Sequence, residues 1–274
     1  MFRLLPLCLI GLLGAAPPSG GWPAPPKTST IKSVYDGDTV TLATGDKIRL
    51  RWVNTPELRP LEAYGIEARE ATERFLINSK VRLILASDNP RDSYGRVLAG
   101  LETESGNLSI HLLEMGLGHL FIIPPEDTDL EPLLKAQQMA RSANRGIWST
   151  DRYKGGIHIT SFHANAAGDD YQNVNGEYLR MCNINQKPLN LDGYRLTDIS
   201  GKSWPLPAIV IPAGHTVKVH SGSGEHQLNA SKQLEIYLGS TTPIWNNKRD
   251  KAVLYDRFGR VVDAVLHEVQ KERP

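Results

Sequence analysis

The chain has 274 residues, of which 40% are hydrophobic and 22% charged, and its formal net charge is +1. This composition excludes a disordered or fibrous chain and leaves room for one large domain or two ordinary ones. The near-neutral charge also argues against a wide basic surface of the kind that binds nucleic acid. Any contact with nucleic acid is therefore expected to be local, made by a few arginines in a compact site.

Residues 1–16 are typical of a signal peptide. Arg3 gives a positive start, residues 4–13 are apolar, and small residues follow at 14–16. The apolar run is about half of the roughly twenty residues that a membrane-spanning helix needs. Residues 17–28 form a proline-rich linker that cannot continue a helix. We expect a secreted, periplasmic or cell-envelope protein whose leader is either removed or kept as an uncleaved anchor, without a transmembrane helix in the mature chain.

Cysteine and histidine chemistry is not expected. Without the leader, Cys182 is the single cysteine, which excludes an internal disulfide and a zinc site built on cysteine pairs. Its neighbours are typical of a strand, so we expect a buried, inert thiol. The histidines show no metal-ligand spacing and are interpreted as surface or core residues.

Residues 29–150 are predicted to form a first domain that mixes strands and helices. β-Branched residues mark the strands, and apolar periodicity marks the helices. In chain order we predict strands at 30–42 and 47–53, a helix at 62–78, strands at 81–86 and 96–102, and helices at 108–115 and 130–143. This order is compatible with a small barrel that carries helices on its outside.

Residues 156–270 are predicted to form a second, all-β domain. Short apolar strands alternate with Gly, Pro, Asn and Asp turns, and no helix is apparent, which favours an antiparallel sandwich. No internal repeat is apparent. The predicted strands are 157–162, 177–183, 194–198, 217–220, 234–238, 252–255 and 261–265.

Three short motifs of the first domain carry the chemistry. The first, Asp36-Gly37-Asp38-Thr39, joins two strands and by itself is also compatible with a simple turn. The second runs from Ile48 to Glu57. Residues two apart on a strand share a face, so Arg49 and Arg51 are expected to point together. The third, Asp92-Ser93-Tyr94-Gly95-Arg96, is a turn that ends on an arginine.

The order of these motifs resembles the staphylococcal nuclease (thermonuclease) family. Tyr64-Gly65-Ile66-Glu67-Ala68 and Gly146-Ile147-Trp148-Ser149 extend the resemblance, which covers residues 29–149. The resemblance implies a five-stranded OB-fold barrel with helices. It also implies calcium as cofactor and hydrolysis of DNA or RNA to leave 3'-phosphates.

The resemblance implies a metal site at three positions. Asp38 matches the metal-binding carboxylate of the family and Thr55 matches its backbone-carbonyl ligand. Asn54 stands where the family usually has a second aspartate. An amide oxygen is still a suitable ligand for Ca²⁺, but one negative charge is lost. We therefore predict weaker calcium binding at this site, but not its loss.

The resemblance also assigns the residues that act on the phosphodiester. Arg49 and Arg96 match the two phosphate-binding arginines, Glu57 matches the proposed general base, and Tyr94 matches a tyrosine that contacts a nucleotide phosphate. Forked guanidinium groups suit the charge that develops on phosphoryl oxygens, and a carboxylate can orient or deprotonate water. Without a catalytic role, Glu57 would be a solvated carboxylate in a loop, and Arg96 would be a residue of a surface turn.

Two further observations keep a second function open. Where the family has tyrosines for nucleotide stacking, residues 120–125 offer only Phe121. Together with Asn54, this motivates an OB-fold surface protein that binds nucleic acid but cuts it weakly or not at all. A third alternative is an adhesion or surface-structural protein whose function lies in the second domain.

Arg51 and Trp52 are expected to have structural roles, in packing and in pairing with other side chains.

The second domain resembles a bacterial lamin-tail domain. The resemblance runs from Gly168-Asp169-Asp170 through Leu189–Tyr194 to Val261-Val262-Asp263 and implies an immunoglobulin-like sandwich that binds or tethers. Substrate, envelope and matrix are the candidate partners, and we expect a monomer. The acidic and amide side chains of the opening segment are compatible with a cation site, but a polar loop is the better interpretation. They are Asp169, Asp170, Asn173 and Asn175.

Overall fold

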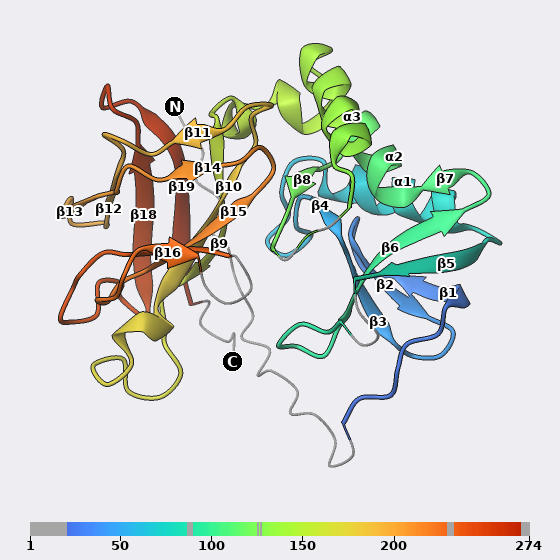
Figure 1. Cartoon of the computed structure of the whole chain (residues 1–274), viewed down its shortest axis with the longest axis horizontal. Coiled ribbons are helices and arrows are strands. Elements are labelled where there is room, and N and C mark those ends of the chain that lie inside the picture. Colours follow the sequence, from blue (N-terminus) through green and yellow to red (C-terminus); the bar gives the residue numbers. More distant parts are fainter. Residues whose placement is uncertain (1–20, 87–89, 125, 127, 229–232, 270–274) are drawn as a thin grey trace, which may run out of the picture. The chain divides into compact units, whose positions relative to one another are not determined.

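The computed structural model describes residues 21–86, 90–124, 126, 128–228 and 233–269, and its parts are shown in Figure 1. The chain divides into two compact units, with the main division between Thr150 and Asp151. Each unit has a hydrophobic core of its own. The predicted signal peptide and the first residues of the predicted linker lie outside the described residues.

The first unit contains a closed five-stranded barrel. Its strands follow the order β3 (Lys47–Leu50), β2 (Thr39–Leu42), β1 (Thr28–Val34), β5 (Lys80–Leu85) and β6 (Val97–Thr103). Parallel pairing of β3 with β6 closes the barrel, and β7 (Gly106–Asn107) extends β6 at its edge. The predicted barrel of the first domain is thereby confirmed.

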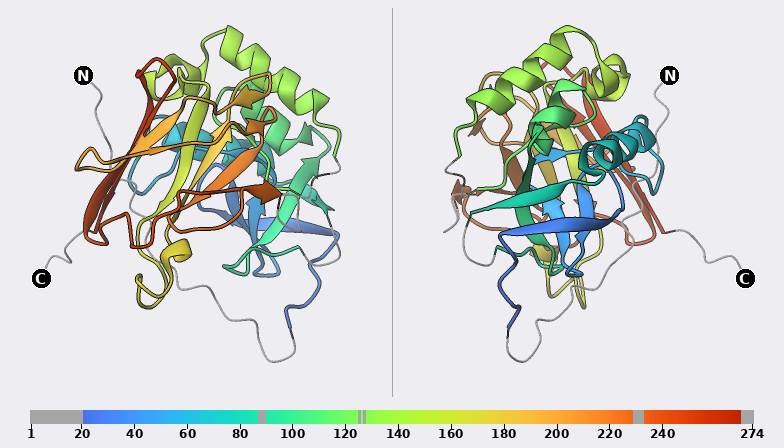
Figure 2. Two further views of the ribbon diagram at one scale, coloured as in Figure 1. Left: turned by 60° about the vertical axis from the view of Figure 1, so that its left-hand side comes forward. Right: turned by 90° about the vertical axis from the view of Figure 1, so that its right-hand side faces the viewer.

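Alternating burial along the strands explains the barrel. Val40 and Leu42 on β2, and Ile48 and Leu50 on β3, are buried, while the residues between them are not. The helices α1 (Gly65–Leu76), α2 (Leu108–Glu114) and α3 (Glu131–Ser142) lie outside the barrel strands (Figures 1 and 2). Asn107 caps α2 by accepting hydrogen bonds from the amides of the first turn.

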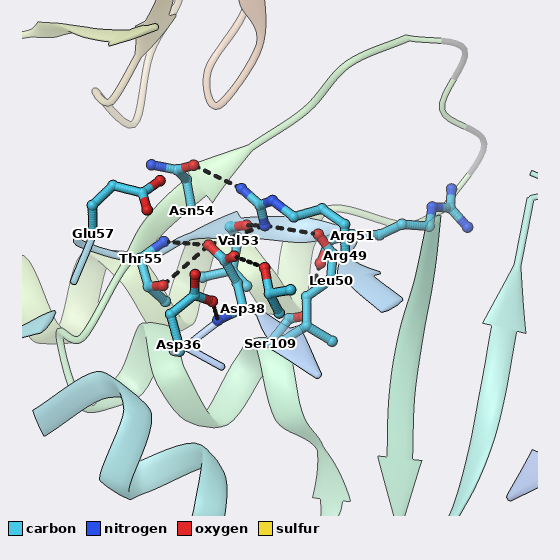
Figure 3. A network of polar contacts seen from close by, with 12 residues as sticks. Asp36, Asp38, Arg49, Leu50, Arg51, Val53, Asn54, Thr55, Glu57 and Ser109 are labelled. Carbon is cyan, nitrogen blue, oxygen red and sulfur yellow. Dashed lines mark hydrogen bonds and ion pairs between the residues drawn. The ribbon is translucent and has the colours of Figure 1, made fainter. Parts of the chain in front are cut away.

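The segment predicted as one strand at 47–53 is two strands. Trp52 has φ = 70°, in the left-handed region, which ends β3 and starts β4 (Trp52–Asn54) in a new direction. The indole lies over Gly100 of β6, where a Cβ atom would come within 2.2 Å of the ring. The expectation that Arg49 and Arg51 point together was wrong, because Arg49 pairs with Asp38 while Arg51 pairs with Glu126 (Figure 3). β4 pairs instead with β8 (His119–Phe121), a strand that the sequence did not predict.

The second unit is built of β-strands. One sheet has the order β16 (Gln227–Leu228), β17 (Leu234–Tyr237), β15 (Thr216–His220), β10 (Tyr178–Asn183) and β9 (Ile157–His163). A second has the order β13 (Ser203–Pro205), β12 (Arg195–Thr197), β18 (Arg249–Tyr255) and β19 (Val261–Glu268), and β11 (Leu189–Asn190) pairs with β14 (Val210–Ile211). This confirms a mostly β second domain, although β15 and β17 run parallel.

The core of the second unit is apolar and includes the edge-on ring pair of Phe162 and Trp245, whose centroids are 4.9 Å apart. Cys182 is fully buried, and this burial raises the pKa of its thiol far above the usual range. The predicted burial of this thiol is thus confirmed. In the described part of the chain, no helix combines the length and apolar character needed to cross a membrane.

Candidate active site

The turn between β1 and β2 is held from two sides. Asp36 accepts a hydrogen bond from the amide of Asp38 at 3.1 Å, which closes the turn on itself. Thr72 of α1 donates to the carbonyl of Gly37 at 2.7 Å. A side chain at Gly37 would come within 2.8 Å of both Thr55 and Ala68, so only glycine fits here. The turn is thus clamped between β4 and α1, and this clamp positions Asp38.

Asp38 is the centre of a buried polar network (Figure 3). Its Oδ2 accepts hydrogen bonds from the amide and the hydroxyl of Thr55, at 2.8 and 3.1 Å. The same oxygen lies 3.0 Å from Nη1 of Arg49. Charge-assisted contacts of this kind hold a carboxylate in one orientation. Two of the predicted site residues, Arg49 and Thr55, are therefore joined directly to the third, Asp38.

Arg49 connects this network to Asn54. Its Nη1 donates to the carbonyl of Val53 at 3.0 Å, and its Nη2 donates to Oδ1 of Asn54 at 2.7 Å. The side-chain oxygen of Asn54 therefore faces the site, as a ligand oxygen must. A guanidinium with its donors already engaged must exchange some of these contacts before it can hold a phosphate.

The site holds more carboxyl groups than one arginine balances. Burial raises the pKa of Asp36 to about 7, and repulsion by Asp38 adds to the rise. Partial burial of the carboxyl group, with repulsion by Asp38 and Asp36, also raises the pKa of Glu57, and exposure of the residue to solvent limits this rise. Arg49 opposes both shifts. Ionisation of these carboxyl groups is opposed by their mutual repulsion, and a cation bound among them would relieve it.

The residues present fit a hard divalent cation. The candidate donors at Asp38, Asn54 and Thr55 are all oxygen atoms, which such ions prefer. Within the described ranges, no group of three or more His, Cys, Asp or Glu side chains is placed to hold a metal ion. A cation here therefore depends on amide, backbone or water oxygens as well as carboxylates.

Arg96 and Tyr94 lie on a separate turn. Asp92 accepts hydrogen bonds from the amides of Tyr94 and Arg96, both at 2.9 Å, and its Oδ2 lies 2.7 Å from Nε of Arg96. The guanidinium of Arg96 stands over the Tyr94 ring, 5.5 Å from its centroid. Among the described residues, no hydrogen bond or ion pair joins Arg96 to the Asp38 network.

Two residues at the site were missed by the sequence reasoning. Asp36, interpreted only as part of a turn, is buried beside Asp38. His119, interpreted as a surface or core residue, is the cross-strand partner of Asn54, and its Nε2 lies 3.5 Å from Nδ2 of the amide. Phe121 shares this face, with its ring centroid 5.8 Å from the guanidinium carbon of Arg49. The two-residue spacing of His119 and Phe121 is the signal that could have revealed β8.

Arg51 and Trp52 are structural, as predicted. Arg51 forms an ion pair with Glu126 at 2.8 Å, and the indole of Trp52 donates to the same carboxylate at 2.7 Å. The guanidinium also stacks on the Trp52 ring, 4.7 Å from its centroid. These contacts hold the bend between β3 and β4.

The acidic segment that opens the second domain hydrogen-bonds within its own loop and to Ser223 and Asn247 of other segments. Asp170 accepts from the amide of Ala166 and Asp169 from that of Tyr171. Asn175 donates to the carbonyl of Ser223. These contacts are those of a polar loop, the interpretation that the sequence favoured.

Comparison with known proteins identifies both domains. A model of staphylococcal nuclease homologues matches residues 47–150, and a Lamin Tail Domain model matches residues 150–268. A thermonuclease of Staphylococcus intermedius is 32% identical over 125 residues, which cover 43% of this chain and 74% of the relative. A thermonuclease of Staphylococcus hyicus is 32% identical over 130 residues, covering 45% and 76%.

A more distant relative is the SPbeta prophage-derived endonuclease YokF of Bacillus subtilis (strain 168). It is 26% identical over 132 residues, which cover 45% of each chain. The matches to these relatives cover less than half of this chain. Two thermonucleases are more than 30% identical to this chain over most of their own length, and the closed barrel carries the motifs of the family. These findings establish the family of the first domain. The chain belongs to the staphylococcal nuclease family, and its nuclease domain is followed by a lamin-tail domain.

Proposed function

We propose that this protein is an exported, calcium-dependent nuclease that hydrolyses DNA or RNA and leaves 3'-phosphate ends. The observation that carries the proposal is the network in which Asp38, Arg49, Asn54 and Thr55 meet beside Glu57. Relatives called thermonuclease and endonuclease support the reaction class.

The proposed roles follow from chemistry and position. Asp38, Asn54 and Thr55 hold the cation, which supplies positive charge close to the phosphate when bound. Glu57 accepts a proton from the attacking water, whose oxygen forms a bond to phosphorus while the bond to the 5'-oxygen breaks and that oxygen takes up a proton from solvent. Arg49 and Arg96 hold the phosphoryl oxygens, where negative charge grows in the transition state. Tyr94 contacts the phosphate of a neighbouring nucleotide.

The electrostatics of Glu57 bear on this role. Its pKa is raised by burial of the carboxyl group and by repulsion from Asp38 and Asp36, which favours the protonated form when no cation is bound. Positive charge at Asp38 opposes the repulsion that raises this pKa and so favours the ionised form that can act as a base. Cation binding would therefore promote the ionisation of Glu57 and so activate it as the base.

A second candidate function is a nucleic-acid-binding module that cuts weakly or not at all. It is favoured by Asn54, which removes a negative charge from the cation site, and by the single aromatic residue Phe121 on β8. The retained Asp38, Arg49, Glu57 and Arg96 favour cutting. Binding without turnover in the presence of several divalent metals would select the module.

The deciding experiment is a cleavage assay on the full chain. Single-stranded DNA and RNA are incubated with the protein and Ca²⁺ or a chelator, and the ends are analysed. We expect calcium-dependent cleavage to 3'-phosphates and strong suppression by Glu57→Ser. Glu104→Ser, which removes a carboxylate from an exposed turn, serves as the matched control. Undiminished cleavage by Glu57→Ser would sink the proposed mechanism.

Export and tethering are proposed on other grounds. The leader at residues 1–16 supports export, and the lamin-tail domain supports attachment to substrate, envelope or matrix. Fusion of residues 1–28 to a reporter that is active only outside the cytoplasm tests export. Light scattering on the purified chain tests the expected monomer.

A further inference from the structure

A five-residue motif of the nuclease domain occurs again in the lamin-tail domain. The first copy is Asp92-Ser93-Tyr94-Gly95-Arg96, and the second is Asp256-Arg257-Phe258-Gly259-Arg260, in the turn between β18 and β19. Both have aspartate first, an aromatic ring third, glycine fourth and arginine fifth. The spacing alone is a weak signal, so the geometry has to decide whether the two turns are alike.

The two turns have the same hydrogen bonds. In the second copy, Asp256 accepts from the amides of Phe258 and Arg260, both at 2.9 Å, and its Oδ2 lies 2.8 Å from Nε of Arg260. The backbone bonds between the first and fifth residues match, with 3.0 Å from the amide of Asp92 to the carbonyl of Arg96 and 3.0 Å from Asp256 to Arg260. The glycines have φ values of 76° and 75°.

The rings and guanidinium groups also correspond. The guanidinium carbon of Arg260 lies 5.0 Å from the centroid of the Phe258 ring, close to the 5.5 Å between Arg96 and Tyr94. The second turn is far more open. The Arg260 side chain is 73% exposed, against 29% for Arg96, and Phe258 is 74% exposed. The Phe258 ring and the Arg260 guanidinium are therefore both accessible to a ligand.

More cations and rings gather around the second turn. Arg195 stacks on its cross-strand partner Tyr255, with the guanidinium carbon 3.9 Å from the ring centroid. Gly193 leaves room for Arg257, because a side chain there would come within 2.8 Å of the Arg257 Cβ. Burial raises the pKa of Tyr194, the charge of Asp256 adds to the rise, and Arg257 and Arg260 oppose it.

The arginines and aromatic rings around the β18–β19 turn suit one kind of partner. Within the described part of the chain neither Arg195 nor Arg257 forms an ion pair, and Asp256 is already engaged by Arg260. Arginines interleaved with aromatic rings suit a single strand of nucleic acid, whose phosphates pair with guanidinium groups and whose bases stack on rings. A flat, charged protein partner offers no reason for the open Phe258 ring.

We propose that the β18–β19 turn of the lamin-tail domain is a second binding site for a single strand of DNA or RNA, with Arg260 on a phosphate and Phe258 stacked on a base. The role of this strand as the substrate rests on the proposed function, whereas the binding itself does not. The site lets the second domain hold a strand that the first domain cuts.

The test measures binding without cleavage. The full chain carrying Glu57→Ser is titrated, in a chelator, into a fluorescent oligothymidylate of about 15 nucleotides, and anisotropy is followed over a range of salt concentrations. Phe258→Ala is expected to weaken binding roughly tenfold without changing the salt dependence, because it removes stacking. Arg260→Ala is expected to reduce the slope of log affinity against log salt by about 0.7, the effect of one phosphate contact.

Controls separate the site from a general loss of structure or charge. Phe258→Tyr keeps the ring and is expected to retain affinity. Arg249→Ala removes an exposed arginine from the start of β18, away from the turn, and is expected to bind like the parent. Affinity and salt slope unchanged in both Phe258→Ala and Arg260→Ala would overturn the proposal.

A membrane surface is the alternative partner, and a separate vesicle-binding experiment tests it. The protein is mixed with vesicles of phosphatidylglycerol and phosphatidylcholine. Vesicle binding that depends on Phe258, with oligonucleotide affinity unaffected by the same change, would overturn the nucleic-acid site. If the unsubstituted chain does not cleave nucleic acid in calcium, the proposed function is contradicted. The binding site is not, because the binding measurement does not depend on cleavage.

Discussion

The Asp92–Arg96 turn and the Asp256–Arg260 turn share their hydrogen bonds but not their surroundings. In the nuclease domain, the Trp22 ring packs against Gly95, and Arg91 donates to the carbonyl of Gly95 at 2.8 Å while pairing with Asp46. In the lamin-tail domain, nothing lies within 4 Å of the position that a Cβ of Gly259 would occupy. The same local sequence therefore produces the same turn, and the tertiary structure decides whether its arginine is largely covered or left open.

This difference has a functional meaning. A preorganised arginine stabilises a transition state because no energy is spent in orienting it during the reaction. An open arginine with an exposed ring suits a strand that must be held in several registers. We therefore expect the first turn to govern rate and the second to govern affinity. The following predictions would break or sharpen this contrast.

The largest expected effect is that of Arg96→Ala on cleavage. Loss of a preorganised charge-stabilising group lowers the rate by roughly 10²–10³. Initial rates on a single-stranded oligonucleotide in calcium measure it, with Arg249→Ala in the second domain as the charge-matched control. A rate within about threefold of wild type would show that the first turn has no catalytic role.

Glycine substitutions compare the two turns directly. Both glycines have φ near +75°, so alanine is strained by about 1 kcal/mol at either position. Gly95→Ala also pushes a Cβ to 2.8 Å from the Trp22 ring, so we expect a total cost of about 2–3 kcal/mol there. Hydrogen exchange in increasing urea reads the stability of each domain separately. Equal losses at the two positions would contradict the buttressing by Trp22.

Asp36 predicts how the stability of the cation-free nuclease domain depends on pH. Its folded pKa of about 7 lies above the ordinary value of 3.8, so between these values the unfolded chain binds fewer protons. Stability relative to Asp36→Asn is therefore highest at low pH and falls as pH rises through 7, by roughly 1–3 kcal/mol. Urea unfolding in a chelator at pH 5 and pH 8 measures the change. A difference that does not depend on pH would rule out the raised pKa.

The smallest expected effect is that of Asn54→Asp on calcium affinity. The change restores a carboxylate next to Arg49 and Asp38 and should tighten calcium binding by roughly tenfold, or about 1.4 kcal/mol. Titration calorimetry measures the affinity. Asn144→Asp adds the same charge at an exposed position after α3 and is the control. Unchanged or weaker binding by Asn54→Asp would reject the account of Asn54.

Much of the fold follows from local patterns. The helices α1, α2 and α3 lie within or close to their predicted ranges, because apolar spacing and stop signals are properties of short segments. The strands β4 and β8 were misjudged or missed. Each is held by the other and by the Trp52 ring over Gly100, contacts between residues far apart in the sequence.

The candidate site divides in the same way. The sequence by itself determined the residue types: the carboxylates, the arginines and the turn motifs, whose hydrogen bonds are made within five residues. Only the tertiary structure decided that Asp36 and His119 join the site, and that one turn is buttressed while the other stays open. The physical reason is that burial and the resulting pKa shifts arise from packing between distant segments, which no local pattern records.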